Sequence, residues 1–258
     1  MIQPRSRPTS INTAAMERLP IIYRDEYLVA INKPSGLLVH RSPIDRHETR
    51  FALQLLRDQI GQRVYPVHRL DKPTSGVLLF ALTPEVARAV SEQLADHSVL
   101  KSYLAVVRGW CPLHGVIDHA LQDQPDKIAD RNRTQARPTR DAVTRFERLD
   151  TVEIPYAVDR YPQSRYSLVA LQPEQGRKHQ LRRHMKHLGY PIIGDAKHGK
   201  GVHNRFFAEK YGCGRLLLAC TGMDFNHPVN GDTVHIRAGL DAAFQRVLSA
   251  FGWKEPSP

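Results

Sequence analysis

Residues 66-PVHRLDKPTSG-76 place one carboxylate, Asp71, between two cations and directly before the apolar run 77-VLLFAL-82. If the chain around Asp71 is extended, Arg69 and Asp71 point to one side and Leu70 points toward the core. A nearby guanidinium favours the charged form of a carboxylate. An ionised carboxylate in a basic groove can act as a nucleophile or a base. A structural salt bridge at a strand edge explains the same residues equally well.

A second segment, 176-GRKHQLRRHMKHLG-189, concentrates basic and histidine side chains. On a helix at about 100° per residue, His179 and His184 lie about 140° apart, so they cannot converge on one metal ion. The same spacing gives the helix an apolar stripe and a basic stripe. The apolar stripe is Leu181, Met185 and Leu188, and the basic stripe is Lys178, His179, Arg182, Arg183 and Lys186. The basic stripe either contacts an anion or is a solvated face.

Two other motifs resemble cofactor sites but lack an essential residue. The segment 194-GDAKHGKG-201 follows the phosphate-binding loop pattern, but Gly201 stands where a hydroxyl is needed as a magnesium ligand. The segment 47-HETRF-51 begins like a zinc motif, but Phe51 replaces the second histidine. We therefore expect neither a metal nor an organic cofactor.

The overall charge favours a nucleic-acid partner. The 258 residues carry 37 Lys and Arg against 26 Asp and Glu, which gives a formal net charge of +11. Such a field attracts polyanions, although a basic protein without such a partner can have the same composition. No apolar run approaches the roughly 18 residues of a membrane span, and no signal peptide is visible. Cys111, Cys213 and Cys220 form no C-x-x-C pair, which predicts free thiols in a cytoplasmic protein.

The elements that must position these residues are mainly strands. The apolar run 77–82 predicts a buried strand, and Thr83 and Pro84 after it predict the first residues of a helix. Residues 240–251 have the spacing of a packed C-terminal helix. Further strands are predicted at 27-YLVAI-31, 103-YLAVV-107, 166-YSLVAL-171 and 216-LLLAC-220. This pattern predicts an α+β fold with a mixed central sheet and flanking helices and loops.

Two stretches show no periodic pattern. Residues 1–20 are polar and carry three prolines, so we expect a disordered extension in which Met16 is an alternative start. Residues 123–142 predict a long loop. Its arginines, Arg131, Arg133, Arg137 and Arg140, either contact phosphates or are solvated. No Gly/Ser-rich linker divides the rest, so we expect residues 21–258 to form a single domain.

Four co-linear motifs make the chain similar to the RluA-type pseudouridine synthases. The catalytic motif of that family resembles 68-HRLDKPTSG-76. The other matching segments are 32-NKPSGL-37, 101-KSYLAVVRG-109, 176-GRKHQLRRH-184, 190-YPIIGDAKHG-199 and 227-HPVNG-231. The resemblance covers roughly residues 21–240. It implies a largely antiparallel catalytic sheet and the isomerisation of a uridine in RNA without a cofactor.

The resemblance also implies roles for individual residues. Asp71 matches the nucleophilic aspartate, Tyr103 the active-site tyrosine and Arg182 the arginine that pairs with the aspartate. Asp71 would drive glycosidic cleavage by attack on the ribose or by promoting elimination, and Tyr103 would stack on the base and is a candidate general base. Arg69 would fill the gap left by the flipped uridine. The other expected RNA contacts are His68, Lys33, Lys178, His179, Arg183, Arg131 and Arg133.

Short phrases resemble a subgroup of the family that acts in the T-arm of tRNA, at uridine 65. They are 40-HRSPIDRHE-48, 127-KIAD-130, 160-RYPQSRY-166 and 251-FGW-253. That subgroup has no separate RNA-binding domain. At Ala219-Cys220 the chain departs from the family pattern, which has a histidine there. The departure affects the details of one wall of the site. A ribosomal RNA substrate and a non-catalytic RNA-binding module are the alternatives. We expect a monomer that needs no membrane and no protein partner.

Overall fold

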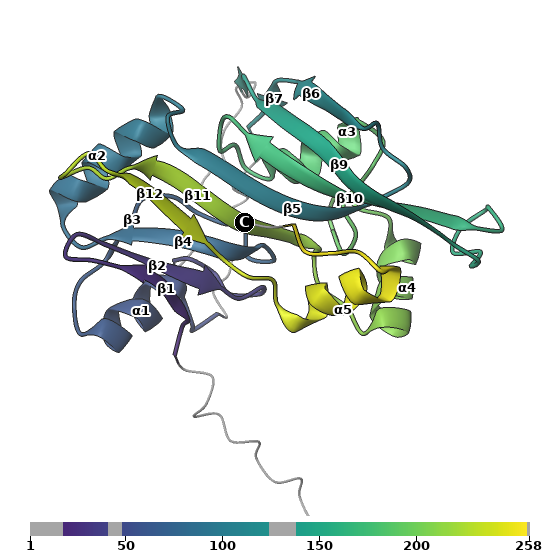
Figure 1. Cartoon of the computed structure of the whole chain (residues 1–258), viewed down its shortest axis with the longest axis horizontal. Helices are drawn as coiled ribbons and strands as arrows, with labels where there is room; N and C mark the ends of the chain where they lie inside the picture. Colours follow the sequence, from purple (N-terminus) through teal and green to yellow (C-terminus); the bar gives the residue numbers. More distant parts are fainter. Residues whose placement is uncertain (1–17, 41–47, 124–137, 257–258) are drawn as a thin grey trace, which may run out of the picture.

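The computed structural model describes residues 18–40, 48–123 and 138–256, and its elements are labelled in Figure 1. The strands are β1 (Ile21–Arg24), β2 (Leu28–Lys33), β3 (Tyr65–Pro66), β4 (Ser75–Ala81), β5 (Leu100–Arg108), β6 (His114–Asp118), β7 (Leu121–Gln122), β8 (Thr139–Arg140), β9 (Val143–Ile154), β10 (Ser164–Pro173), β11 (Leu218–Asn226) and β12 (Thr233–Arg237). The helices are α1 (Ala52–Ile60), α2 (Pro84–Ala95), α3 (Gln180–His187), α4 (Gly201–Tyr211) and α5 (Ala242–Phe251).

One sheet runs through the described part of the chain, in the order β1-β2-β4-β11-β5-β10-β9-β6. Strand β12 pairs with β11 and β3 pairs with β4, while β7 and β8 form a separate ribbon. Every strand pair in the described residues is antiparallel except β4 with β11. The predicted α+β fold with a mixed, largely antiparallel sheet is therefore confirmed.

Strand β4 carries the chain away from Asp71 through the middle of the molecule. All seven of its residues are buried, as the apolar run predicted. At Gly76 the φ angle is +107°, and a Cβ atom would lie 2.0 Å from the Cys220 carbonyl oxygen, so only glycine fits where β4 meets β11. Helix α2 follows as predicted, with the Thr83 hydroxyl accepting a hydrogen bond from the Val86 N–H.

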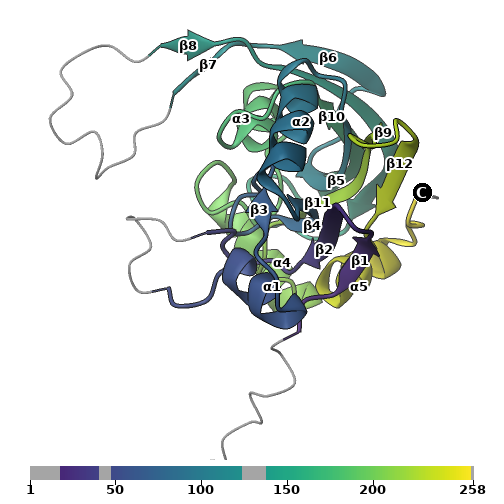
Figure 2. The same ribbon diagram turned by 90° about the vertical axis from the view of Figure 1, so that its left-hand side faces the viewer.

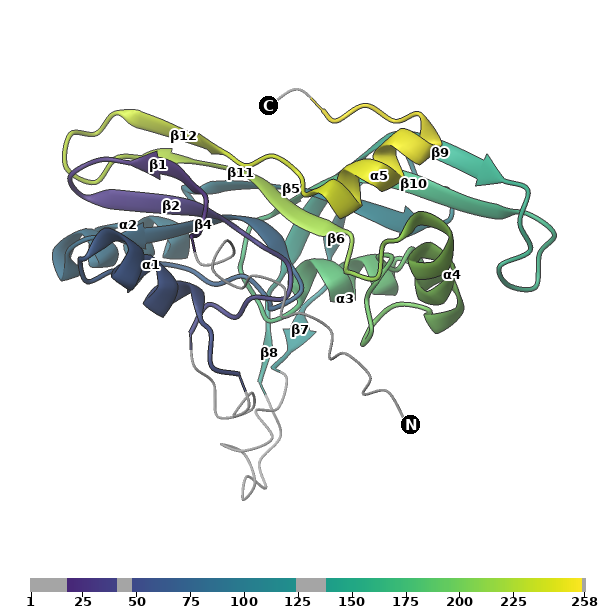
Figure 3. The same ribbon diagram turned by 90° about the horizontal axis from the view of Figure 1, so that it is seen from below.

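Helices cover both faces of the sheet. Helix α3 packs with Ala105 and Val107 of β5, whereas α4 and α5 pack with Leu104 and Val106. Successive residues of a strand point to opposite faces, so these helices lie on opposite sides of β5. Helices α1 and α2 lie at the β2–β4 end of the sheet, and α4 and α5 lie near the other end (Figure 3). Figure 2 shows that the sheet is curved, with α2 and α3 on its concave side.

The structure corrects two local expectations. Helix α3 begins at Gln180, because His179 adopts a left-handed conformation with φ 57°. Arg182 is consequently buried and does not lie on a solvated basic stripe. The core also includes a residue before Ile21, since Leu19 is buried and its N–H donates to the Gln59 side chain.

Some expectations fall outside the described residues. They concern residues 1–17 of the predicted extension and the loop arginines Arg131, Arg133 and Arg137. None of the helices in the described residues is long and apolar enough to cross a membrane.

Candidate active site

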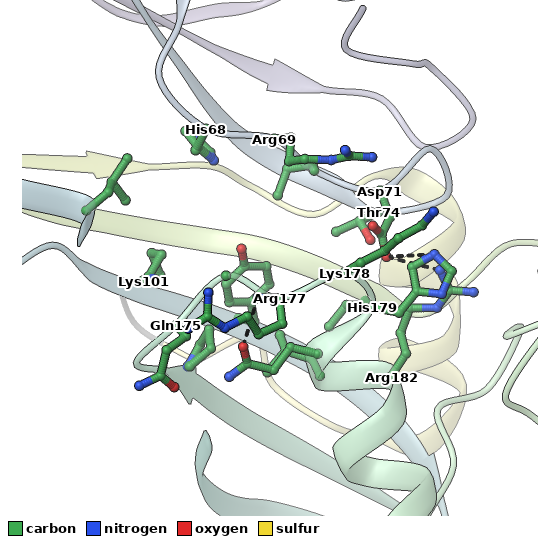
Figure 4. Close-up of a pocket in the computed structure, with 18 of the residues that line it drawn as sticks. His68, Arg69, Asp71, Thr74, Lys101, Gln175, Arg177, Lys178, His179 and Arg182 are labelled. Atoms are coloured by element: carbon green, nitrogen blue, oxygen red, sulfur yellow. Dashed lines mark hydrogen bonds and ion pairs between the residues drawn. The ribbon is translucent and has the colours of Figure 1, made fainter. Parts of the chain in front are cut away.

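The predicted site residues converge on a cavity of about 520 Å³ on the side of the sheet that carries α2 and α3. Residues from the loop before β4, the first half of β5, the end of α2 and the β10–α3 connection form its walls. Seven of the predicted residues line it, namely His68, Arg69, Asp71, Tyr103, Lys178, His179 and Arg182. Most of them are labelled in Figure 4.

Asp71 lies in the cavity wall and keeps 18% of its side chain exposed. Its Oδ2 accepts a hydrogen bond of 3.0 Å from Nη1 of Arg182, a residue 111 positions later in the chain. The same oxygen lies 3.7 Å from Nε2 of His179 (Figure 4). The expected pair between Asp71 and Arg182 is therefore present, and one face of the carboxylate stays open to the cavity.

Arg182 is held in place from behind by Asp195, a residue that the sequence reasoning did not select. Its Nε and Nη2 donate to the two Asp195 carboxylate oxygens at 2.7 and 2.8 Å. The Asp195 side chain is 0% exposed and also accepts from the backbone N–H groups of Lys197 and His198. A bidentate pair fixes the guanidinium plane as well as its position.

The buried pair shifts both ionisation equilibria toward the charged forms. Burial alone raises the pKa of Asp195, but the hydrogen bonds from Arg182 and from the His198 N–H outweigh it and lower that pKa. Burial opposes the charge on Arg182 as well, but Asp195 and then Asp71 raise the pKa of the guanidinium. Arg182 is therefore a permanent cation aimed at Asp71.

His179 is the second neighbour of Asp71. Its Nδ1 lies 2.9 Å from Nε2 of His198, which ties the left-handed turn before α3 to the segment that carries Asp195. Burial lowers the pKa of His179 to about 4, although the Asp71 charge acts in the opposite direction. The imidazole is thus neutral near pH 7, and Arg182 provides the positive charge beside Asp71.

Tyr103 lies on β5 with its side chain in the cavity wall, opposite Cys220 of β11. Burial, followed by the neighbouring Cys220 thiol, raises the pKa of Tyr103 well above its usual value. Burial also raises the pKa of Cys220 to about 12. The departure from the family pattern at Cys220 therefore places a neutral thiol beside a neutral phenol.

Two predicted RNA contacts support the Asp71 loop from inside the protein. The ammonium group of Lys33 is fully buried and donates to the carbonyl oxygens of Pro34, Leu37 and Lys72. Lys33 does not face RNA in this structure, contrary to the expectation, because its side chain is buried and its Nζ is bonded to these three carbonyls. His68 lines the cavity, but its Nε2 accepts from the Leu79 N–H at 3.0 Å. Burial, and then the Lys101 charge, lower the pKa of His68 to about 4.

The remaining predicted cations differ in exposure. Arg69 is exposed at the cavity, and within residues 18–40, 48–123 and 138–256 it has no hydrogen-bond or ion-pair partner. Lys178 lines the cavity and is half-buried. Arg183 is half-buried. Burial lowers the pKa of its guanidinium, and the Asp123 charge acts in the opposite direction. Arg183 does not line the cavity.

Lys101 is a further cavity residue that the sequence reasoning missed. Its side chain is buried and donates to the Glu174 carbonyl oxygen at 3.1 Å, and burial lowers its pKa. Lys101 lies within the quoted motif 101-KSYLAVVRG-109, two positions before Tyr103. Residues two positions apart on a strand point to the same side, so Lys101 is expected on the same side of β5 as Tyr103. This alternation was the signal that could have identified Lys101.

Comparison with known proteins identifies the family. The sequence pattern described as RNA pseudouridylate synthase matches residues 27–187, which is more than half of the chain. The chain belongs to this family. A tRNA pseudouridine synthase C from Vibrio cholerae serotype O1 is 52% identical over 237 residues, covering 92% of this chain and 97% of the relative. Another from Haemophilus ducreyi is 54% identical and covers 91% and 96%.

Solved structures agree with this membership. Human RNA pseudouridylate synthase domain containing 4 superposes with a TM-score of 0.67 at 26% identity, covering 92% of this chain and 95% of that chain. Human RNA pseudouridylate synthase domain containing 1 gives a TM-score of 0.66 at 23% identity, covering 96% and 100%, and shows a common fold. As an RNA pseudouridylate synthase, the protein is an isomerase.

The geometry suits a pseudouridylate synthase. An isomerisation leaves the atom count of the substrate unchanged, so the protein must supply a reactive group and positioning. In the described residues, no group of three or more histidine, cysteine or acidic side chains has the arrangement of a metal site. The cavity instead offers one carboxylate, one fixed guanidinium and an aromatic ring, on a site that is open to a nucleoside.

Proposed function

We propose that the protein converts uridine 65 in the T-arm of tRNA to pseudouridine. The observation that carries the proposal is the Asp71 carboxylate, held by Arg182 in an open cavity that also presents Tyr103. The tRNA substrate is supported by relatives named tRNA pseudouridine synthase C, which are 49–54% identical over at least 91% of this chain.

In the proposed reaction, the bond between uracil N1 and ribose C1′ breaks, the base rotates, and C5 joins C1′. Asp71 drives the cleavage, either by forming an ester at C1′ or by promoting elimination of a proton from C2′. On the first route the attack of C5 on C1′ displaces the Asp71 ester, and on the second C2′ regains its proton. The proton at C5 then leaves and N1 gains a proton, so the product is an isomer of the substrate. Arg182 keeps the Asp71 oxygen aimed throughout, and its own position is set by Asp195 before RNA arrives.

Tyr103 is proposed to stack on the uracil while the base is detached. Aromatic stacking contributes roughly 1–3 kcal/mol per base, which helps to retain the free base during rotation. The raised pKa keeps the phenol protonated in the free protein. A role as the base at C5 therefore requires the phenol to lose its proton only after the substrate has bound.

The target uridine must leave its stem to reach Asp71, at a cost of a few kcal/mol. Arg69 is the candidate for filling the gap, since it is exposed beside the cavity and has no partner among the described residues. Lys178 is the candidate for a phosphate contact at the same opening, with His68 and His179 in the wall behind it. Arg183, Arg131 and Arg133 are proposed to contact phosphates farther out.

We also infer that residues 21–258 act as one catalytic unit, because a single sheet connects β1 to β12 across the described chain. The protein is proposed to work as a monomer in the cytoplasm without a protein partner. Its three cysteines are free and buried, as is common where thiols are kept reduced.

The direct test incubates the purified protein with unmodified tRNA and, separately, with unmodified ribosomal RNA, followed by pseudouridine mapping. The expected product is a single pseudouridine at position 65 of the tRNA T-stem. Modification of ribosomal RNA alone would replace the tRNA substrate by the ribosomal one. Binding of RNA without any pseudouridine would favour a non-catalytic RNA-binding module.

A further inference from the structure

A second cavity, here named the distal pocket, lies at the other end of α3. It has a volume of about 540 Å³, and its lining includes Arg108, Asp159, Arg160, Tyr161, Tyr190 and His203. Arg182 is in the first turn of α3, and Gly189 follows the helix and lines the distal pocket. At about 1.5 Å per residue, the active site and the distal pocket are roughly 10 Å apart along the helix axis. Figure 1 shows the β9–β10 hairpin beside α4 at this end of the sheet.

The distal pocket presents an aromatic ring that the fold does not use. Tyr161 is 59% exposed, the highest value among the exposed large hydrophobic side chains of the described residues. The Arg160 guanidinium carbon lies over this ring, 4.8 Å from its centroid. The Tyr190 ring, which also lines the pocket, packs over Gly109, where a Cβ atom would lie 3.1 Å from it. A stacked arginine and tyrosine form a flat, polarised surface on which a base can stack.

Within the described residues, the acidic groups around the distal pocket leave Arg160 without an ion pair. Arg165 forms an ion pair of 2.5 Å with Glu153, and Asp159 is paired with Lys200 and lies 4.0 Å from Arg108. Arg160 has no acidic partner in the described part of the chain. An exposed guanidinium without a partner is available to a phosphate.

The loop that carries Tyr161 is already ordered. The Ser164 hydroxyl donates to the Tyr156 carbonyl oxygen at 2.9 Å, and the Asp159–Lys200 pair links the loop to the residue before α4. Pro162 restricts the backbone conformation of Tyr161, the residue before it. A ligand that binds here does not have to order the loop, so little conformational entropy is lost on binding.

We propose that the distal pocket binds an unpaired nucleotide of the substrate RNA, with the base on Tyr161 and its phosphate on Arg160. A nucleotide combines a flat base and an anion, which suits an aromatic ring with one face left open and, over its other face, a guanidinium that has no acidic partner among the described residues. The basic net charge of +11 favours the same partner. The inference rests on the proposed function only for the identity of the RNA.

The test uses Tyr161→Ala and Arg160→Glu, with Arg246→Glu as the matched charge control. Arg246 is exposed on α5, outside the distal pocket, and donates to the Gly212 carbonyl oxygen. Dissociation constants are measured by fluorescence anisotropy at two salt concentrations, with the RNA that the wild-type protein modifies. Tyr161→Ala is expected to raise the Kd roughly 5- to 100-fold. Arg160→Glu is expected to make the negative slope of log K against log salt shallower by about one.

At saturating RNA, both pocket variants are expected to keep the wild-type kcat, because neither residue touches Asp71. Wild-type melting temperatures establish that the variants are folded. The inference is overturned if both pocket variants bind RNA as tightly as Arg246→Glu, which is also the result expected if the pocket holds an acidic peptide. Loss of kcat with an unchanged Kd would overturn it as well. If the wild-type protein modifies ribosomal RNA only, the tRNA proposal fails while the distal pocket is still tested on that RNA.

Discussion

The active site and the distal pocket lie at the two ends of α3 and use arginine in opposite ways. Arg182 is 6% exposed, and each of its three terminal nitrogens donates to a carboxylate of the protein. Arg160 is exposed, and among the described residues its guanidinium has no ion-pair partner and lies over the ring of Tyr161. A buried, paired arginine has a fixed orientation before RNA arrives, whereas an exposed one keeps its hydrogen-bonding capacity for the ligand. Arg182 is therefore suited to position the Asp71 carboxylate, whereas Arg160 is suited to bind a ligand.

The comparison predicts its largest effect at Asp195. Asp195→Ala leaves the buried Arg182 without its bidentate partner, and breaking a buried pair typically costs about 3–5 kcal/mol of unfolding free energy. Turnover is expected to fall as well, because Arg182 loses its fixed direction toward Asp71. Urea denaturation measures the stability change. The control Asp58→Ala removes an exposed partner of Arg57 and is expected to cost no more than about 1 kcal/mol.

An equal loss of stability in Asp195→Ala and Asp58→Ala, together with unchanged turnover in Asp195→Ala, would contradict the positioning role of the buried pair. The alternative outcome, in which Asp195→Ala is stable but inactive, would keep that role and assign the pair to catalysis alone.

The next largest effect is acid destabilisation through buried histidines such as His203. Burial lowers the pKa of His203 from 6.5 to about 4, and its Nδ1 lies 2.8 Å from the Tyr166 hydroxyl. The unfolded chain therefore binds the proton first, so this contribution to stability is present above pH 6.5 and is lost as the pH falls toward 4. The shift corresponds to about 3 kcal/mol.

Unfolding free energies of His203→Gln and wild type, measured from pH 7 to pH 4, test this effect. The loss of stability in acid is expected to be about 3 kcal/mol smaller in His203→Gln. The control His114→Gln, at an exposed position of β6, should follow the wild-type curve. A His203→Gln curve that parallels wild type would show that this histidine is protonated equally in both states.

The smallest of these effects is expected at Arg69, which is exposed like Arg160 but lies at the active site. Arg69→Ala is expected to lower kcat/KM about tenfold, equivalent to about 1.4 kcal/mol, because the gap left by the flipped uridine is no longer filled. Its unfolding free energy should stay within about 0.5 kcal/mol of wild type. Steady-state kinetics measure kcat/KM, and urea denaturation measures the unfolding free energy. An unchanged kcat/KM would assign Arg69 to the solvated surface.

Local sequence signals predicted most of the fold. The apolar run at 77–82 and the Thr83-Pro84 cap lead to β4 and α2, because burial and capping act over a few residues. The start of α3 was missed, since a helical projection does not reveal that His179 adopts a left-handed conformation, with its ring in contact with His198, 19 positions away. A helical projection alone could not place Arg182 inside the protein.

The candidate site was predicted through motifs, and its supporting residues were not. The motifs identified Asp71, Tyr103 and Arg182, which line one cavity. Asp195 is the only acidic residue between Glu174 and Glu209 in a strongly basic stretch, a signal that was available but not used. Lys33 was assigned to RNA, whereas three backbone carbonyls hold it inside. Arg182 and Asp195 lie 13 positions apart, and Lys33 is joined to Lys72 across 39 positions.

The central claim is that the Asp71 carboxylate acts on the flipped uridine, and the most direct test separates RNA binding from turnover in Asp71→Asn. RNA labelled with tritium at uracil C5 releases the label when C5 joins the ribose, so tritium release measures turnover. Asp71→Asn is expected to release tritium roughly 10³-fold more slowly or not at all, with an unchanged Kd for RNA. Release at the wild-type rate by this variant would contradict the central claim.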